Sequence, residues 1–320
     1  MLPNYPALIA MKQTFSFYGL PGLNAALKKF QFSWKSVVFM ALAGAVTLFV
    51  TLAHRPAYAA YDVQIRPAGP SQGDTVAIVT TEPPGATSIP TVRINDVTYP
   101  TFAIGEGRYR TFLPTSPLHA SGEYIIKVEG PKGLRNPMVW LSDRSFRTQY
   151  INLPPGQSDL GTDYEFDRVD AFKQIQSPEK FWNGPFRRPS QGRVSSEYGV
   201  RRYYNGVFAN DYYHRGVDYA APVGTPVVAP AAGRIALVGR VSQGFELHGN
   251  TIGLDHGQGV KSIFIHLNSI SVNEGDFVQA GQVIGTIGNT GASTGPHLHW
   301  GLYVNDVAVD PEPWRNGTIE

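Results

Sequence analysis

Alternating apolar and polar positions predict β-structure along most of the chain after its first 60 residues. Apolar side chains recur at every second position in short runs, and turn-forming residues separate the runs. Val92 and Ile94, for example, lie directly before an Asn95-Asp96 turn. Short strands at this spacing predict a small antiparallel β-sandwich, immunoglobulin-like in general form, over residues 60–150.

A second β-rich region is predicted over residues 184–320, and its most regular alternation lies near the C-terminus. His297 and His299 fall on one face of the run, whereas the apolar side chains fall on the other. The predicted core face consists of Leu298, Trp300, Leu302 and Val304. This pattern therefore predicts a strand that points two imidazoles into a common space.

A similar strand is predicted around residue 265. Strict alternation predicts that Ile263, Ile265 and Leu267 pack inward, while Phe264 and His266 point the other way. We therefore expect His266 on a strand surface that also carries histidines.

Two other segments complete the predicted organisation. Residues 151–183 contain proline and glycine followed by mixed charge, which predicts a linker with one short helix. Residues 1–59 form a leader in which a basic flank precedes an apolar run, residues 36–53, and an Ala-x-Ala end at Ala57 to Ala59. This pattern predicts a cleaved secretory signal, with an uncleaved membrane anchor as the alternative. Either a cleaved signal or an uncleaved anchor would place the rest of the chain outside the cytoplasm.

Charge and cysteine content narrow the possible partners and ligands. The formal net charge is +2, but the first 59 residues carry five bases and no acid. Subtracting these from the 27 bases leaves 22 against 25 acids, a net charge of −3. A nearly neutral mature chain gives no electrostatic reason to expect nucleic acid as a partner. The chain has no cysteine, which excludes disulfides and thiolate metal ligands.

The candidate chemistry lies in the histidines of the second region. His214 and Asp218 lie four residues apart in a segment whose sequence favours an extended chain, so we expect their side chains to share a face. With His266, His297 and His299 they form a set that three strands can present on one surface. Imidazole nitrogen and carboxylate oxygen suit zinc, whose catalytic sites use three protein ligands and keep a fourth position open.

These motifs resemble the lysostaphin or LytM type of zinc peptidoglycan metallo-endopeptidase. The similarity runs densely from Gly184 to Pro311, whereas the N-terminal region resembles the β-rich modules that precede such peptidases less specifically. The matching motifs include Gly184-Pro185-Phe186, Tyr198-Gly199, His214 to Asp218, Gly224-Thr225-Pro226-Val227, Asp255-His256-Gly257, His266-Leu267, Gly295 to His299 and Asp310-Pro311.

The resemblance implies a role for each residue of the set. His214, Asp218 and His299 are expected to bind Zn²⁺, and His266 and His297 are expected to act on water and to stabilise the oxyanion. The family often has tyrosine two residues before the first of these catalytic histidines, where this chain has Phe264; we expect little effect on the chemistry. His256 matches a family position that is not a ligand, so a structural hydrogen bond is expected. His248 lies in a turn-like segment of the sequence, so we expect its side chain to be exposed to solvent.

The implied function is a secreted enzyme that hydrolyses peptide cross-links or stem peptides of bacterial peptidoglycan. The alternative is a non-catalytic, peptidoglycan-binding activator of other wall hydrolases; retention of all five residues argues against it. A carrier domain of the biotinyl or lipoyl type is a third possibility, suggested by the sequence from Val272 to Gly285. Its expected hairpin tip, Thr286 to Asn289, lacks the lysine that such carriers modify, and the histidines would go unexplained, so the carrier function is rejected. Nothing in the sequence indicates an oligomer.

Overall fold

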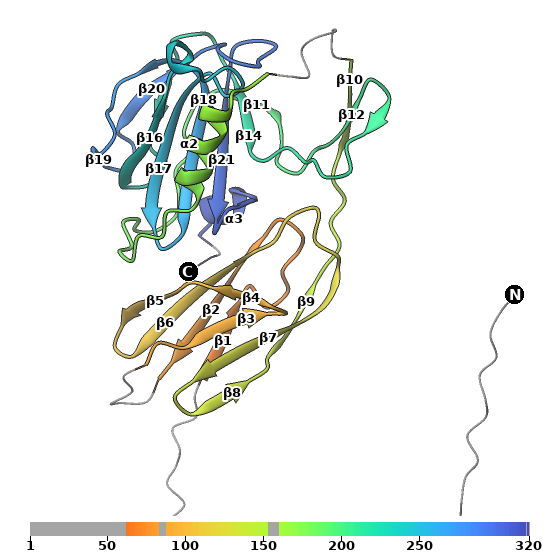
Figure 1. Cartoon of the computed structure of the whole chain (residues 1–320), viewed down its shortest axis with the longest axis vertical. Helices are drawn as coiled ribbons and strands as arrows, with labels where there is room; N and C mark the ends of the chain where they lie inside the picture. The colour runs from red at the N-terminus through yellow and green to blue at the C-terminus, as the bar shows by residue number, and fades with distance from the viewer. Residues whose placement is uncertain (1–61, 83–87, 153–159, 318, 320) are drawn as a thin grey trace, which may run out of the picture. The chain divides into compact units, whose positions relative to one another are not determined.

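The structure is a computed structural model that describes residues 62–82, 88–152, 160–317 and 319 (Figure 1). Strands dominate this part of the chain, so the prediction of a mainly β protein is confirmed. The predicted signal peptide or anchor within residues 1–59 lies outside the described residues. Among the described residues, no helix has both the length and the apolar character needed to cross a bilayer.

The N-terminal strands form two antiparallel sheets. One has the order β1-β2-β6-β5 and the other has the order β4-β3-β7-β8, with β9 also paired to β7. The strands are β1 (Asp62–Arg66), β2 (Thr75–Thr81), β3 (Thr91–Ile94), β4 (Val97–Tyr99), β5 (Thr101–Gly105), β6 (Arg108–Pro114), β7 (Gly122–Gly130), β8 (Gly133–Arg135) and β9 (Met138–Leu141). Asn95 adopts a positive φ of 51° in the β3–β4 turn, as expected for a tight hairpin. The immunoglobulin-like form stays a prediction.

The C-terminal strands form one antiparallel sheet with the path β11-β14-β21-β18-β17-β16-β19. β15 pairs with β20, β20 pairs with β18, and β22 pairs with β21. The strands are β11 (Arg193–Ser196), β14 (Val217–Ala220), β15 (Pro226–Val228), β16 (Gly233–Gly239), β17 (Asn250–Gly257), β18 (Val260–Ile270), β19 (Phe277–Val278), β20 (Val283–Ile287), β21 (His297–Val304) and β22 (Val307–Val309).

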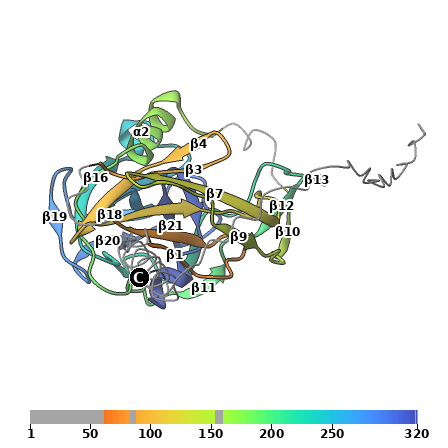
Figure 2. The same ribbon diagram turned by 90° about the horizontal axis from the view of Figure 1, so that it is seen from below.

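A separate small sheet and three short helical segments complete the described chain. β10 (Thr148–Ile151) pairs in parallel with β12 (Arg201–Tyr204), which also pairs with β13 (Val207–Phe208). Helix α2 (Asp163–Lys173) occupies the segment for which one short helix was expected, and it lies beside β16 (Figure 2). Helix α3 (Glu312–Arg315) and the 3₁₀ turn η1 (Val241–Gln243) are shorter.

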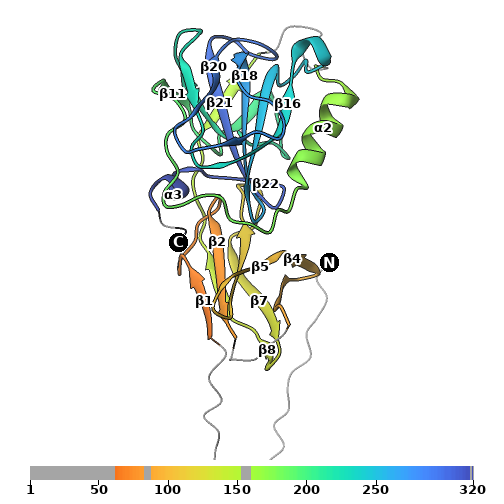
Figure 3. The same ribbon diagram turned by 90° about the vertical axis from the view of Figure 1, so that its left-hand side faces the viewer.

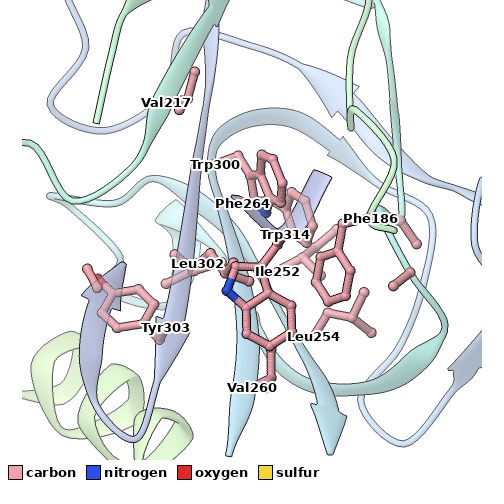
Figure 4. Packing of buried hydrophobic residues seen from close by; sticks show 14 of the residues in the cluster. Phe186, Val217, Ile252, Leu254, Val260, Phe264, Trp300, Leu302, Tyr303 and Trp314 are labelled. Atoms are coloured by element: carbon pink, nitrogen blue, oxygen red, sulfur yellow. The ribbon is translucent and has the colours of Figure 1, made fainter. Parts of the chain in front are cut away.

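The predicted core face of β21 is confirmed. Leu298, Trp300, Leu302 and Val304 are all fully buried. Trp300 stands directly opposite Phe264 on β18, and both contribute to the cluster of apolar side chains in Figure 4. One face of the sheet is therefore packed, which leaves the other face of β21 for its histidines.

The core of the C-terminal domain continues into the N-terminal strands. On β2, Val76 and Ile78 pack in the core of the N-terminal sheets, whereas Ala77 belongs to the larger C-terminal core. On β6, Phe112 lies in that larger core as well, with its ring centroid 5.3 Å from that of Trp314 in α3. Figure 3 shows α3 close to the end of β2, and the Trp314 Nε1–H donates to Thr75 Oγ1 over 3.0 Å. The two parts of the described chain thus share buried side chains.

This shared core predicts that residues 60–320 unfold as one cooperative unit. Phe112→Ala removes a fully buried ring from the junction and is expected to lower the free energy of unfolding by about 3–5 kcal/mol. Urea unfolding followed both by fluorescence and by far-UV circular dichroism is expected to give a single coincident transition, shifted to lower denaturant in the variant. Phe277→Ala, at a ring that is 45% exposed, is the control and should shift the midpoint much less. Two separate transitions in the unmodified chain would contradict the shared core.

Candidate metal centre

The pairing of β14 with β21 brings the first two candidate ligands together. Asp218 on β14 stands directly opposite His299 on β21, and opposed residues of an antiparallel pair point to the same face. The Oδ1 atom of Asp218 lies 2.9 Å from Nδ1 of His299. The third candidate ligand, His214, places its Nε2 atom 3.1 Å from the same oxygen and 3.0 Å from the same nitrogen. The three predicted ligands therefore converge on one point.

His214 reaches this point by a different route from the one expected. The prediction placed it on a strand with Asp218, but β14 begins only at Val217. Its backbone is instead held by Val200 O, which accepts from His214 N over 2.8 Å, and by Gly199 N, which donates to His214 O over 2.9 Å. These two backbone hydrogen bonds hold His214 in place of strand pairing, so its side chain still points to the same site as that of Asp218.

The environment of the three side chains favours a carboxylate flanked by imidazole lone pairs. Burial would raise the pKa of Asp218, but the imidazoles of His214 and His299 in contact with the carboxylate outweigh burial and hold that pKa well below its usual range. Burial lowers the pKa of His299 to about 4, even though Asp218 favours its protonated form. His214 is buried, and its Nδ1–H donates to Glu197 O over 2.7 Å, which leaves Nε2 as an acceptor toward Asp218.

The strand that carries His266 departs from strict alternation. Phe264 is fully buried opposite Trp300, and Ile265 is the residue opposite His299, so the predicted faces of these two residues were wrong. The register between β17 and β18 shifts at this point, and His266 adopts a φ of +65°. Such a bulge turns a side chain to the other face, which is how His266 reaches the site.

His266 and His297 lie beside each other next to the three candidate ligands. Their ring centroids are 4.8 Å apart, and His297 Nε2 lies 3.9 Å from Asp218 Oδ1. The Nδ1–H of His266 donates to Thr290 O over 2.8 Å, and that of His297 donates to Gly295 O over 2.8 Å. Burial, followed by the nearby His297 and His299, lowers the pKa of His266 to about 3. All five predicted site residues are thus gathered around one centre.

Two further histidines had predicted environments: the structural role of His256 is confirmed, and the predicted exposure of His248 is corrected. His256 is fully buried, its Nδ1–H donates to Ala232 O, and its Nε2 accepts from Ser262 Oγ, so its structural role is confirmed. His248 is not an exposed surface residue. Its Nδ1 lies 2.7 Å from Glu165 Oε1, and its side chain is only 18% exposed. No sequence pattern indicates this contact, because the two residues are 83 positions apart.

Comparison with known proteins identifies the part of the chain that contains this centre. Residues 212–311 match the profile of peptidase family M23. The chain carries a peptidase M23 domain. The match contains all five residues of the centre, whereas the N-terminal sheets and α2 lie outside it.

Two curated bacterial proteins and one solved structure show how far the similarity extends. The chain is 42% identical over 119 residues to the DD-carboxypeptidase/endopeptidase Mpg of Neisseria meningitidis serogroup B, covering 37% of this chain and 26% of Mpg. It is 40% identical over 119 residues to the peptidoglycan DD-endopeptidase ShyC of Vibrio cholerae, again covering 37% and 26%. The matched segment thus spans about a quarter of each relative.

The solved structure extends the similarity beyond the M23 domain. A peptidase M23 from Pseudomonas aeruginosa aligns at 25% identity with a TM-score of 0.57, covering 78% of this chain and 96% of its own. The alignment therefore includes N-terminal strands as well as the M23 domain, and the prediction of a lysostaphin-type C-terminal fold is confirmed.

The tight packing behind His299 predicts that Gly216→Ala weakens metal binding. A Cβ atom at Gly216 would lie 2.3 Å from Trp300 O and 2.7 Å from His299 Nε2, so the backbone or the imidazole must move. We expect zinc affinity, measured by competition with a chromogenic chelator, to fall about 10–100-fold, as for other disturbed ligand supports. Gly69→Ala, which adds a methyl group in open space, is the control. Unchanged affinity in Gly216→Ala would show that His299 does not bind the metal.

Proposed function

We propose that the chain is a zinc-dependent metallo-endopeptidase that hydrolyses peptide bonds of bacterial peptidoglycan outside the cytoplasm. The observation that carries this proposal is the convergence of His214, Asp218 and His299, with His266 and His297 beside them. In this proposal the first three bind Zn²⁺, and the other two handle protons.

The donor atoms fit a zinc ion. Tetrahedral ligands at about 2.0–2.1 Å from zinc lie roughly 3.3 Å apart, close to the separations found among the three donors. Those separations are 2.9–3.1 Å. His214 also presents an acceptor nitrogen to a carboxylate oxygen, because its Nδ1–H is donated to Glu197 O. Two acceptors at this distance repel each other unless a cation or a proton lies between them.

The chain's own side chains are suited to proton transfer during amide hydrolysis. When bound, zinc supplies a Lewis acid for the scissile carbonyl and lowers the pKa of water. His266 and His297 both donate Nδ1–H to a backbone carbonyl, so each keeps an Nε2 lone pair that can accept a proton from the attacking water. Once protonated, the same nitrogen can donate to the oxyanion or to the leaving amine.

The choice of substrate rests on the relatives. ShyC is described as a peptidoglycan DD-endopeptidase, and Mpg is described as a DD-carboxypeptidase/endopeptidase. Peptidoglycan lies outside the cytoplasm, which agrees with the export predicted from residues 1–59. The alternative, a non-catalytic activator of other wall hydrolases, needs none of the five side chains, and their convergence favours the enzyme.

Digestion of purified peptidoglycan tests the proposed activity. Residues 60–320 loaded with zinc are expected to release soluble muropeptides, and mass spectrometry of these fragments identifies the cleaved bond. His299→Ala removes one proposed ligand and is expected to lower both the zinc content and the release of fragments by at least 100-fold. Fragment release that persists in this variant, or that survives complete removal of metal by a chelator, would contradict the proposal.

A further inference from the structure

The small sheet of β10, β12 and β13 presents two chemically different faces. Side chains alternate along β12, so Arg201 and Tyr203 share one face and Arg202 and Tyr204 share the other. On the first face Tyr203 stacks on the exposed Tyr150, with ring centroids 4.7 Å apart. The second face gathers a guanidinium group and phenol groups.

Among the described residues, Arg202 on this second face forms its side-chain hydrogen bonds with uncharged partners. Its Nη1 donates to Tyr204 OH over 3.2 Å and to Tyr212 OH over 2.6 Å, and its Nε donates to Gln149 Oε1 over 3.3 Å. Burial raises the pKa of Tyr212, so its phenol stays neutral. Within the described residues, no carboxylate forms an ion pair with Arg202. A half-buried guanidinium therefore keeps its charge without a counter-charge in contact.

The position of Arg202 places this charge beside the metal centre. Val200 O binds His214 N, and Arg202 follows Val200 by two residues on the same segment. Tyr212, which holds the guanidinium, precedes His214 by two residues. The guanidinium also interacts favourably with the carboxylate of Asp218.

We propose that Arg202, oriented by Tyr204 and Tyr212, binds a free carboxylate of the peptide substrate close to the scissile bond. This inference rests on the proposed peptidase function and adds a substrate class to it, namely peptides with an acidic group near the cleaved amide. A planar guanidinium offers a fork of N–H donors that matches a carboxylate, and the two phenols fix its orientation. The substrate carboxylate would supply the contacting counter-charge that no carboxylate among the described residues provides.

A pair of stem peptides that differ only in one group tests this subsite. The acidic form carries a free carboxylate next to the scissile amide, and the second form carries a carboxamide there. We expect residues 60–320 to cleave the acidic form with a kcat/KM about 10–100-fold higher, as for a charge-assisted hydrogen bond. Arg202→Gln should abolish this preference, so that the variant cleaves the two forms at rates within about twofold of each other. Arg201→Gln, on the opposite face, is the matched control and should keep the preference.

The possible negative results can be told apart, because some contradict the Arg202 subsite and others contradict the proposed peptidase function. Equal losses on both peptides in Arg202→Gln would show a structural role and overturn the subsite. Cleavage of both peptides at equal rates by the unmodified chain would overturn it as well. Calorimetric binding of the same two peptides separates the subsite from the proposed function: carboxylate-dependent binding without hydrolysis keeps the subsite and rejects the peptidase. Binding and hydrolysis that both ignore the carboxylate reject the subsite alone.

A second, independent observation concerns the buried carboxylate of Glu165 in α2. Its Oε2 accepts from the backbone N–H groups of Glu246 and Leu247, at 3.1 and 3.0 Å. Its Oε1 accepts from His248 N over 2.6 Å and lies 2.7 Å from His248 Nδ1. Although burial opposes ionisation, these contacts lower the pKa of Glu165 to about 2. One carboxylate therefore holds three consecutive residues of a loop.

That loop in turn holds the backbone of His266. The His266 N–H donates to His248 O over 2.9 Å, and Ala292 N donates to Leu247 O over 2.9 Å. The second of these bonds ties the loop to the segment whose Thr290 O accepts from His266 Nδ1. His266 adopts a positive φ, which costs about 1–3 kcal/mol in a non-glycine residue and persists only where surrounding contacts enforce it.

We infer that Glu165 is a positioning residue that holds His266 at the candidate metal centre through the loop at residues 246–248. Helix α2 lies outside the segment matched to the M23 family, so this contact belongs to the preceding segment of the chain. The inference rests on the proposed role of His266.

Glu165→Gln tests the inference because an amide keeps the size of the side chain but turns donors toward backbone N–H groups. We expect kcat on peptidoglycan fragments to fall about 10–100-fold, with KM and zinc content within about twofold. The ¹⁵N resonances of the His266 ring should shift, whereas those of His256 should not. Asp163→Asn, at an exposed acid in the first turn of the same helix, is the matched control. An unchanged kcat, or a loss of zinc in parallel with kcat, would overturn the assignment; activity absent from the unmodified chain would instead reject the proposed function.

Discussion

The register between β14 and β21 is the constraint on which the candidate centre depends. It sets Asp218 opposite His299, and the same pairing sets Val217 opposite Trp300. A slip of one residue would exchange the two faces of a strand, so the imidazoles would enter the core and Trp300 would leave it. Burial of one large apolar side chain is worth about 1.5–3 kcal/mol, and β21 buries four such side chains on its core face. The apolar face of β21 thus enforces the geometry of its polar face.

The loops beside the sheet supply backbone carbonyls that are available to fix the imidazoles of the site. Carbonyl groups inside a ladder are already bonded to the neighbouring strand, so they are poorly available to fix an imidazole. The three carbonyls that accept Nδ1–H from His214, His266 and His297 belong to Glu197, Thr290 and Gly295, and none of these lies in a strand. The sheet therefore positions the histidine backbones, whereas the loops select the tautomers and leave Nε2 directed into the site.

The sequence allowed the mainly β fold and the gathering of the five site residues to be predicted, because both follow from alternation and from the family resemblance. The faces of Phe264 and Ile265 were predicted wrongly because a bulge at His266 breaks the period of two, and alternation carries no sign of a bulge. Glu165 could not be predicted, since its partners lie more than 80 residues away and other acids in α2 are exposed. β2 did carry an unused signal: it is apolar on both faces, as expected for a strand buried on both sides.

That two-sided burial bears on the role of the N-terminal sheets. A tethered docking module would present a polar surface to the peptidase domain, whereas here Ala77 and Phe112 lie in the peptidase core. The contact also reaches the candidate centre through β21. This strand carries His299 near its start, and Asn305, just beyond its other end, donates from Nδ2 to Phe112 O over 2.9 Å. Because a paired central strand is stiff, the N-terminal sheets help to fix the strand that presents the histidines, and they are part of the folded unit that carries the site.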